Sequence, residues 1–240
     1  YKTMNTVIHK AETRGNANHG WLNSNHTFSF ANYHNPERMN FGVLRVLNDD
    51  RVQAGMGFGT HPHDNMEIIS IPLEGDLEHK DSIGNVAVIK EGDVQVLSAG
   101  TGITHSEYNK NKDKEVKFLQ IWVFPKEKNV SPRYDQISIR DIEKENKFYQ
   151  VLSPSKEDQG VWINQDAWFN LGKFSKGSRD QYKIQKPGNG VYVFVLEGDV
   201  EINGEQLSLR DGMGIWDAES INLMANSDAR VLLMDVPMNL

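Results

Sequence analysis

The residues with the clearest capacity for chemistry lie in two short segments of the first half of the sequence. One segment contains His61 and His63 (GTHPHDNME), and the other contains His105 and Glu107 (AGTGITHSE). The sequence has eight histidines, and none lies beyond position 105. Because alternate side chains of an extended strand point to the same face, each pair is expected to project from one side of its strand.

Three imidazoles and one carboxylate form a ligand set for a single metal ion. If the two segments lie side by side inside a barrel, His61, His63, His105 and Glu107 converge. Such ligands suit iron(II), nickel, copper, manganese or zinc. They leave positions open on an octahedral ion, as a catalytic site requires. We therefore predict a metal centre in the first half of the chain.

Either segment alone is more typical of surface or turn residues, and it is their occurrence together within one structural unit that favours a metal site. Glu67 has the same strand parity as His61 and His63, so it is a further candidate, either as a ligand or as a residue that orients a ligand histidine. His79 follows a turn and is expected to be solvated. The remaining histidines are interpreted as surface or packing residues: His9, His19, His26 and His34.

The elements that must position these side chains are strands. Segments 116–124 (VKFLQIWVF), 190–196 (GVYVFVL) and 229–236 (ARVLLMDV) are short and rich in β-branched and aromatic residues. Many of the 20 glycines stand beside Asp or Asn, as in turns between strands. Helical patterns are limited to one or two turns within 137–150. The predicted fold class is all-β, a sandwich or barrel.

A weak internal repeat divides the chain. Leu73–Leu77 (LEGDL) recurs as Leu196–Val200 (LEGDV), 123 residues later, and Ile89–Asp93 (IKEGD) matches Leu209–Met213 (LRDGM), 120 residues later. Two matches in the same order, with similar flanking patterns, predict a duplicated β-unit.

We place the N-terminal, metal-binding domain at 1–130 and the C-terminal domain at 145–240, with the boundary in the polar, proline-containing stretch 125–155. The first forty residues lie outside the repeat. They contain Trp21, Phe28 and Phe30, and we interpret them as an aromatic arm that packs on the first barrel.

Composition excludes several classes of function. The net charge of −7 disfavours direct contact with nucleic acid. The absence of cysteine excludes disulfides, thiol nucleophiles and cysteine-ligated metals. The longest apolar runs have about six residues, so no membrane-spanning segment is expected. No apolar signal sequence is visible, and a cytoplasmic location is the simplest expectation.

These motifs resemble the cupin superfamily and, more closely, the pirin family of bicupins. Gly55, His61, His63, Glu67 and Gly75 match the first cupin motif. The usual second motif has its histidine where this chain has Ile103, and the string AGTGITHSE is instead similar to the pirin pattern. The arm strings NHGW and HTFSFA are also similar to those of pirins.

The resemblance implies two tandem cupin (double-stranded β-helix) barrels with an N-terminal arm. It also implies one divalent metal ion on His61, His63, His105 and Glu107. Iron is the first expectation, and nickel, copper, manganese and zinc are alternatives. The second barrel is expected to lack a site, because the positions equivalent to the ligands and to Glu67 are occupied by Ile184, Lys186, Gly190, Ala225 and Ser227.

The function implied by the resemblance is that of the bacterial pirin-like quercetin 2,3-dioxygenases, in which O2 opens a flavonol ring with release of carbon monoxide. Glu107 is the first choice for accepting the proton of the substrate hydroxyl, and Glu67 the second. Phe58, Met56 and Ile103 are candidates for lining an apolar slot beside the metal.

One alternative is a non-catalytic, redox-sensing pirin that binds a protein partner, either a transcription regulator or a metabolic enzyme. Another is an enzyme whose native substrate is not a flavonol.

Overall fold

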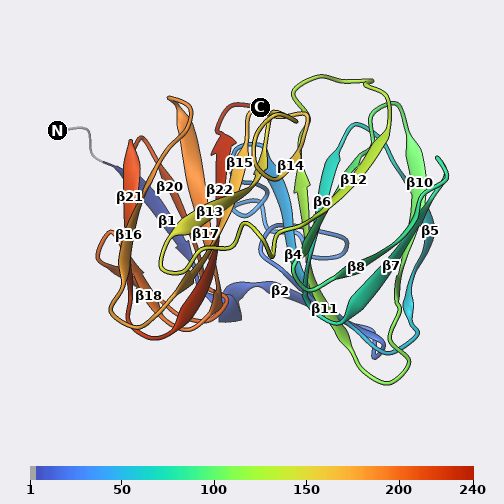
Figure 1. Ribbon diagram of the computed structural model, residues 1–240, viewed down its shortest axis with the longest axis horizontal. Coiled ribbons are helices and arrows are strands. Elements are labelled where there is room, and N and C mark those ends of the chain that lie inside the picture. The colour runs from blue at the N-terminus through green and yellow to red at the C-terminus, as the bar shows by residue number, and fades with distance from the viewer. Residues whose placement is uncertain (1–3) are drawn as a thin grey trace.

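The chain folds into two β-sandwich halves that lie side by side (Figure 1). The structure is a computed structural model that describes residues 4–240; residues 1–3 of the predicted N-terminal domain lie outside that range. Each half pairs a seven-stranded sheet with a four-stranded sheet. Within residues 4–240 the one helical element is a 3-10 turn, η1 (Ala11–Thr13). The predicted all-β class and the two-barrel organisation are confirmed.

The N-terminal half contains the strands that carry the candidate site. Across its larger sheet the order is β12 (Arg133–Ser138), β9 (Asp93–Ser98), β6 (Glu67–Glu74), β11 (Val116–Val123), β4 (Leu44–Val52), β3 (Leu22–His26) and β2 (Gly15–Asn18). Across its smaller sheet the order is β5 (Gly57–His63), β10 (Ile103–Asn109), β7 (Asp76–Asp81) and β8 (Val86–Lys90).

The C-terminal half repeats this arrangement, as the sequence repeat predicts. Its larger sheet has the order β1 (Asn5–His9), β20 (Gly212–Trp216), β17 (Asn189–Glu197), β22 (Ala229–Pro237), β15 (Trp168–Phe174), β13 (Phe148–Ser153) and β14 (Val161–Trp162). Its smaller sheet has the order β16 (Arg179–Lys183), β21 (Ser220–Ala225), β18 (Val200–Ile202) and β19 (Glu205–Leu207).

The LEGD turns explain why the repeat is visible in the sequence. Gly75 and Gly198 end equivalent strands with positive φ angles of 80° and 77°. A Cβ atom on Gly198 would lie 2.1 Å from the carbonyl oxygen of Asp228, so a larger residue fits neither the backbone conformation nor the space.

In each half, one edge strand of the larger sheet comes from outside the repeat, and it comes from a different part of the chain in the two halves. In the N-terminal half, β12 pairs with β9 and comes from the segment that joins the halves. In the C-terminal half, the equivalent position beside β20 is taken by β1, from the start of the chain. The blue β1 therefore lies among the orange and red strands in Figure 1. The domain boundaries at 1–130 and 145–240 stay a prediction.

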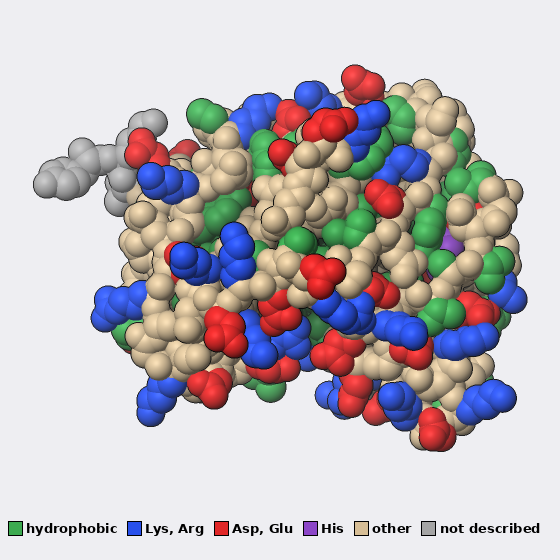
Figure 2. All heavy atoms as spheres, in the orientation of Figure 1, with side chains coloured by type: hydrophobic (Ala, Val, Ile, Leu, Met, Phe, Trp, Pro, Cys, Tyr) green, Lys and Arg blue, Asp and Glu red, His purple; other side chains and the backbone are tan. Residues whose placement is uncertain are grey.

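One continuous core joins the two halves. Buried side chains of the two larger sheets, among them Leu119, Ile121, Phe169 and Phe194, belong to a single apolar cluster. Burial of this kind stabilises the fold by roughly 25 cal/mol for each Å² of apolar surface removed from water. On the surface, acidic and basic side chains are mixed over the face drawn in Figure 2. No helix among the described residues has the length and hydropathy needed to cross a bilayer.

Candidate metal centre

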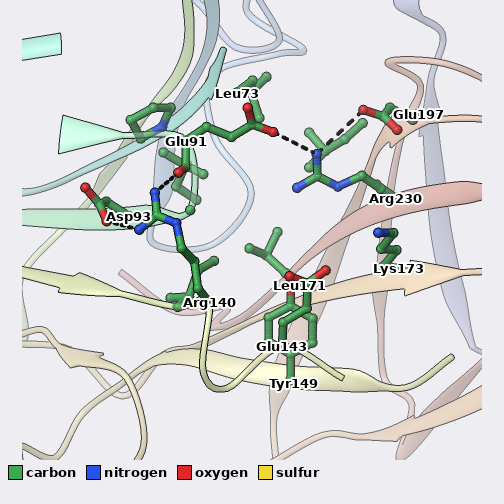
Figure 3. Close-up of a pocket in the computed structure, with 15 residues that line it drawn as sticks. Leu73, Glu91, Asp93, Arg140, Glu143, Tyr149, Leu171, Lys173, Glu197 and Arg230 are labelled. Atoms are coloured by element: carbon green, nitrogen blue, oxygen red, sulfur yellow. Dashed lines mark hydrogen bonds and ion pairs between the residues drawn. The ribbon is translucent and has the colours of Figure 1, made fainter. Parts of the chain in front are cut away.

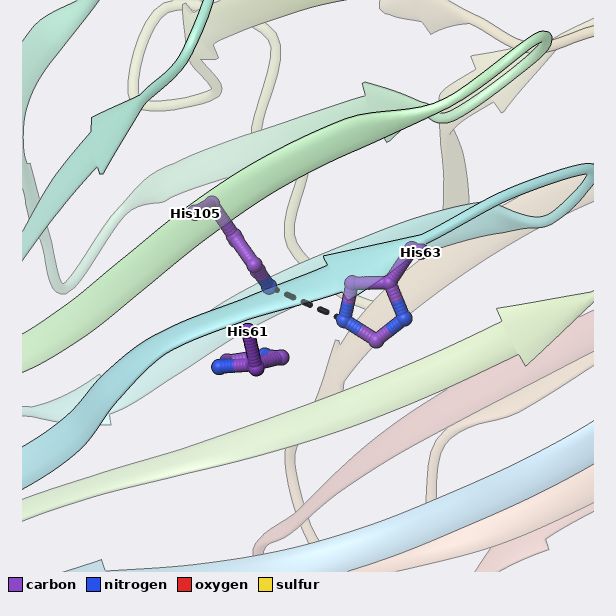
Figure 4. Close-up of side chains that lie close together, drawn as sticks. All are labelled: His61, His63 and His105. Atoms are coloured by element: carbon purple, nitrogen blue, oxygen red, sulfur yellow. Dashed lines mark hydrogen bonds between the residues drawn. The ribbon is translucent and has the colours of Figure 1, made fainter.

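Three predicted ligands meet where β5 and β10 pair. His61 lies directly opposite His105 in the antiparallel register, and His63 lies two residues further along β5. The ligand nitrogens of the three histidines all lie within 4.8 Å of one another. The Nε2 atoms of His63 and His105 are 3.0 Å apart, and the ring of His61 is close to both (Figure 4). Strand parity therefore predicted this juxtaposition.

Burial keeps two of these imidazoles, those of His63 and His105, neutral. It lowers the pKa of His63 to about 4, and the adjacent His61 acts in the same direction. Burial lowers the pKa of His105 still further, with added effects from His61 and His63. A neutral imidazole has a free nitrogen lone pair, which is the form that binds a metal. The Nδ1 atom of His105 is also buried without a hydrogen-bond partner among the described residues. Three converging imidazole nitrogens are a donor set that fits a divalent transition metal.

Glu107 lies beside His105 but outside the triad. Its Oε1 is 3.5 Å from Nδ1 of His105, and its Oε2 accepts a hydrogen bond from Nε2 of Gln120 at 3.1 Å. Burial, and to a lesser extent the nearby Asp50, raises the pKa of Glu107 to about 8. Without a metal, the carboxyl is therefore protonated at neutral pH. Its assignment as the fourth ligand stays a prediction.

The sequence left open whether Glu67 is a metal ligand or orients a ligand histidine, and the structure shows a different role. Its Oε1 accepts a hydrogen bond from the backbone N–H of Asn164 at 2.6 Å, and its Oε2 accepts one from Ser98 at 2.6 Å. The parity argument failed because Asn65, with φ of +46°, turns the chain between β5 and β6. The two strands belong to different sheets, so Glu67 ties the N-terminal half to the C-terminal half instead of facing the triad.

The prediction that His79 is solvated was wrong. His79 is fully buried, its Nε2–H donates a hydrogen bond to the carboxylate of Asp81 at 2.7 Å, and its ring stacks on Tyr134. It points inward because β7 pairs with β10, where His79 lies opposite Glu107. Among the other histidines, His19 and His34 are exposed, whereas His9 packs on Phe28 and Tyr192 and His26 packs on Phe30. These four agree with the surface-or-packing interpretation.

A cavity of about 270 Å³ opens beside the triad. His61 and His63 line it, together with Phe58 as predicted. Met56 and Ile103 do not line it, so those two assignments were wrong. Seven of its fourteen lining residues belong to the aromatic arm. The arm packs on the first barrel as predicted, through β2 and β3, and it also builds half of the cavity wall.

Several polar residues of the cavity were missed from the sequence. Ser24, Asn48, Asp50, Gln120 and Trp122 all line it. A signal was present, because Asn48 and Asp50 on β4, and Ser24 and His26 on β3, are pairs of polar residues two positions apart in strands. Buried, evenly spaced polar residues on inward-facing strand positions are a sign of a lined cavity.

The barrel of the C-terminal half is filled with apolar side chains. Its interior cluster includes Val193, Ile202, Met213 and Leu233. Two of the positions equivalent to the predicted ligands hold side chains that make other contacts. Lys186 forms an ion pair with Asp166, and the hydroxyl of Ser227 accepts a hydrogen bond from the backbone N–H of Asp199. A metal-free second barrel stays a prediction.

Comparison with known proteins places these features in context. Residues 7–123 match the family model Pirin, and residues 150–236 match the model of the quercetinase C-terminal cupin domain. Quercetin 2,3-dioxygenase of Escherichia coli strain K12 is 44% identical over 230 residues, which are 96% of this chain and 98% of that protein. A pirin-like protein of Caulobacter vibrioides is 39% identical over 222 residues, 92% of this chain and 95% of that protein.

Solved structures give the same picture. The crystal structure of YhhW from Escherichia coli has a TM-score of 0.92 and 43% identity, covering 98% of this chain and 99% of that one. The structure of the bacterial pirin YhhW in complex with nickel(II) has a TM-score of 0.91 and 44% identity, covering 97% and 99%. A mutant of Bacillus subtilis oxalate decarboxylase, at 9% identity and a TM-score of 0.68, shares the fold alone.

Proposed function

Because the chain belongs to the pirin family of bicupins, we propose that it is a metal-dependent dioxygenase that opens flavonols such as quercetin with O2 and releases carbon monoxide. The observation that carries the proposal is the convergence of three imidazoles, of which those of His61 and His63 line a cavity that also has aromatic side chains in its wall. A related protein of similar length carries the name quercetin 2,3-dioxygenase, and a related structure holds nickel.

His61, His63 and His105 would hold the divalent ion, with Glu107 as the fourth ligand. Iron is the first expectation from the family, and nickel is the ion in the related structure. A metal held there supplies Lewis acidity, which lowers the pKa of a hydroxyl group bound to it. His63 and His105 are suited to this task because burial keeps their imidazoles unprotonated at neutral pH.

Glu107 is the residue that we assign to proton transfer. Positive charge beside a buried carboxyl favours its ionised form, and an ionised Glu107 is able to accept the proton of the substrate hydroxyl. Gln120 holds the carboxyl in place through its hydrogen bond to Oε2. Glu67 has no part in this step, because its two oxygens are bound to Ser98 and to the backbone of Asn164.

The flat substrate would lie between aromatic side chains. Phe30, Phe58 and Trp122 line the cavity, and Trp122 packs edge-on against both Phe30 and His63. Aromatic walls favour a planar ring system, and they exclude water from the reacting atoms.

The test is incubation of metal-loaded protein with quercetin, with and without O2. We expect loss of the flavonol absorbance and release of carbon monoxide only when O2 is present. No loss of absorbance with iron, nickel, copper and manganese in turn would remove the proposal. It would leave two candidates, the non-catalytic, partner-binding function and an enzyme whose native substrate is not a flavonol.

A further inference from the structure

The cavity beside the triad has one polar wall, of which only Gln120 has a part in the proposed metal chemistry, through its hydrogen bond to Glu107. His26, Asn48 and Gln120 lie directly opposite one another on β3, β4 and β11. Directly paired residues of neighbouring strands project from the same face of a sheet. These three residues, which we call the polar row, all line the cavity and are at most 9% exposed.

Polar atoms along this wall lack partners. Among the described residues, Nδ1 of His26, Oδ1 of Asn48 and Nε1 of Trp122 are buried without a hydrogen bond. All three residues line the same cavity. Leaving one such group unpaired costs about 1–3 kcal/mol, and native proteins leave few of them. Three of the residues that line the cavity therefore have hydrogen-bonding capacity that the protein itself does not use.

The chemistry of the wall restricts the class of ligand that fits it. Burial lowers the pKa of His26, so its ring is neutral and offers one donor and one acceptor. The Asn48 amide and the Trp122 N–H are also uncharged. No lysine or arginine lines the cavity, so a carboxylate or phosphate group would find no cationic partner there. Neutral hydroxyl and carbonyl groups match this wall.

A second, larger cavity differs in this respect. It has a volume of about 500 Å³ and lies between the two larger sheets, with charged side chains around it (Figure 3). Those charges pair with each other: Arg140 binds Asp93 at 3.0 Å, and Arg230 lies 3.6 Å from Glu197 and 3.9 Å from Glu91. None of the residues that line this second cavity is among the described residues with a buried polar atom that lacks a partner.

We propose that the polar row, together with Nε1 of Trp122, is a recognition site for the neutral hydroxyl and carbonyl groups of a flat aromatic ligand, and that Asn48 determines specificity for them. These groups are the ligand oxygens that the histidine triad does not bind. The inference takes the flavonol class from the proposed function, but it concerns binding and does not require turnover.

The experiment measures ligand binding in the absence of O2. Quenching of tryptophan fluorescence would be titrated in nickel-loaded protein with quercetin and with 3-hydroxyflavone, which keeps the ring system and the 3-hydroxyl but lacks the other hydroxyl groups. Wild type should bind quercetin more tightly. Asn48→Leu should lower the quercetin affinity by about tenfold, as expected for one or two neutral hydrogen bonds. It should change the affinity for 3-hydroxyflavone by less than about twofold.

Two further variants make the result specific. His26→Phe keeps a ring but removes both nitrogens, so it should reduce the same selectivity. Asn25→Leu is the matched control, because Asn25 lies next to His26 on β3 but does not line the cavity. Asn48→Leu should also unfold at an unchanged or higher denaturant concentration, because it removes a buried group that has no partner in the free protein.

An unchanged ratio of the two affinities in both Asn48→Leu and His26→Phe would overturn the proposal, whether the two affinities stay the same or fall together. Failure of wild type to bind either compound would overturn it as well. Tight, selective binding without turnover under O2 would support the recognition site while removing the dioxygenase. Turnover of quercetin together with an unchanged ratio of the two affinities in the variants would support the dioxygenase and remove the recognition site.

Discussion

The Nε2 atoms of His63 and His105 lie 3.0 Å apart, although the residues are 42 positions apart in the sequence. Both rings are neutral because burial disfavours their charged forms. Two imidazoles at this distance share at most one proton, so one nitrogen of the pair always presents a lone pair. The pairing of β5 with β10 thus sets up a metal site before any metal arrives.

Removal of a ligand imidazole is expected to abolish tight metal binding while the fold persists. In His61→Ala and His105→Ala, metal affinity should fall by more than the roughly 10- to 100-fold caused by loss of an outer partner. The apolar cluster that joins the halves does not include these residues, so circular dichroism should be unchanged. Elemental analysis is the measurement. Lys186→Ala and Ser227→Ala are the controls, and loss of metal in either one would contradict an empty second barrel.

Glu107→Gln tests the fourth ligand. We expect metal affinity to fall by about 10- to 100-fold and flavonol turnover by at least about 100-fold, because the amide neither binds metal as well nor accepts a proton. Calorimetric titration with nickel, together with the turnover assay, separates the two effects. Wild-type metal affinity combined with lost turnover would restrict Glu107 to proton transfer. Wild-type values of both would refute the assignment.

Glu67→Ala is predicted to affect stability and not the metal. The substitution leaves Ser98 and the backbone N–H of Asn164 without their acceptor. The free energy of unfolding should fall by about 2–4 kcal/mol, measured by urea denaturation, while metal content stays at the wild-type level. Reduced metal content in a variant of normal stability would instead make Glu67 a ligand.

Asp50 predicts a pH dependence of stability in the metal-free protein. Burial raises its pKa from 3.8 to about 7, so the folded protein holds a proton that the unfolded chain releases. The stability from this group is complete below about pH 4 and is lost as the pH rises through 7. At 1.36 kcal/mol per pKa unit, the whole effect is about 4 kcal/mol.

Asp50→Asn should remove this decline. Between pH 4 and pH 8 the variant should gain stability relative to wild type, as measured by urea denaturation in the presence of a chelator. The lowered pKa of His9 acts in the opposite direction, since stability then falls as the pH drops from 6.5 to about 4. This effect is present in both proteins, so it cancels when the stability of wild type is subtracted from that of the variant. A constant difference between the two proteins would show that Asp50 is already ionised.

Local patterns were enough to predict the strands and the triad. The predicted segments 116–124, 190–196 and 229–236 agree to within one residue at each end with β11, β17 and β22. Period-two alternation fixed which side chains share a face, and pairing of β5 with β10 completed the site. These features depend on residues that are close in sequence or that lie on directly paired strands.

The errors have a common physical origin, which is contact between segments that no local pattern relates. The spacing in the sequence places Glu67 on the same face as His61 and His63. Asn65, which has a positive φ, turns the chain before it and places Glu67 in the other sheet. The burial of His79 involves Tyr134 of β12, in the other sheet, which stacks on its ring. The polar row depends on the register of three strands, of which one belongs to the arm.

The exchange of outer strands has a consequence for how the two halves depend on each other. A cut in the joining segment before β12 would leave β1 on the fragment that does not use it, and β12 on the other. The N-terminal fragment would then lack β12 and expose the edge of β9, and the C-terminal fragment would lack β1 and expose the edge of β20. An exposed edge strand of this kind promotes aggregation. The two halves are therefore expected to depend on each other for folding, because each completes its larger sheet with a strand from outside its own repeat.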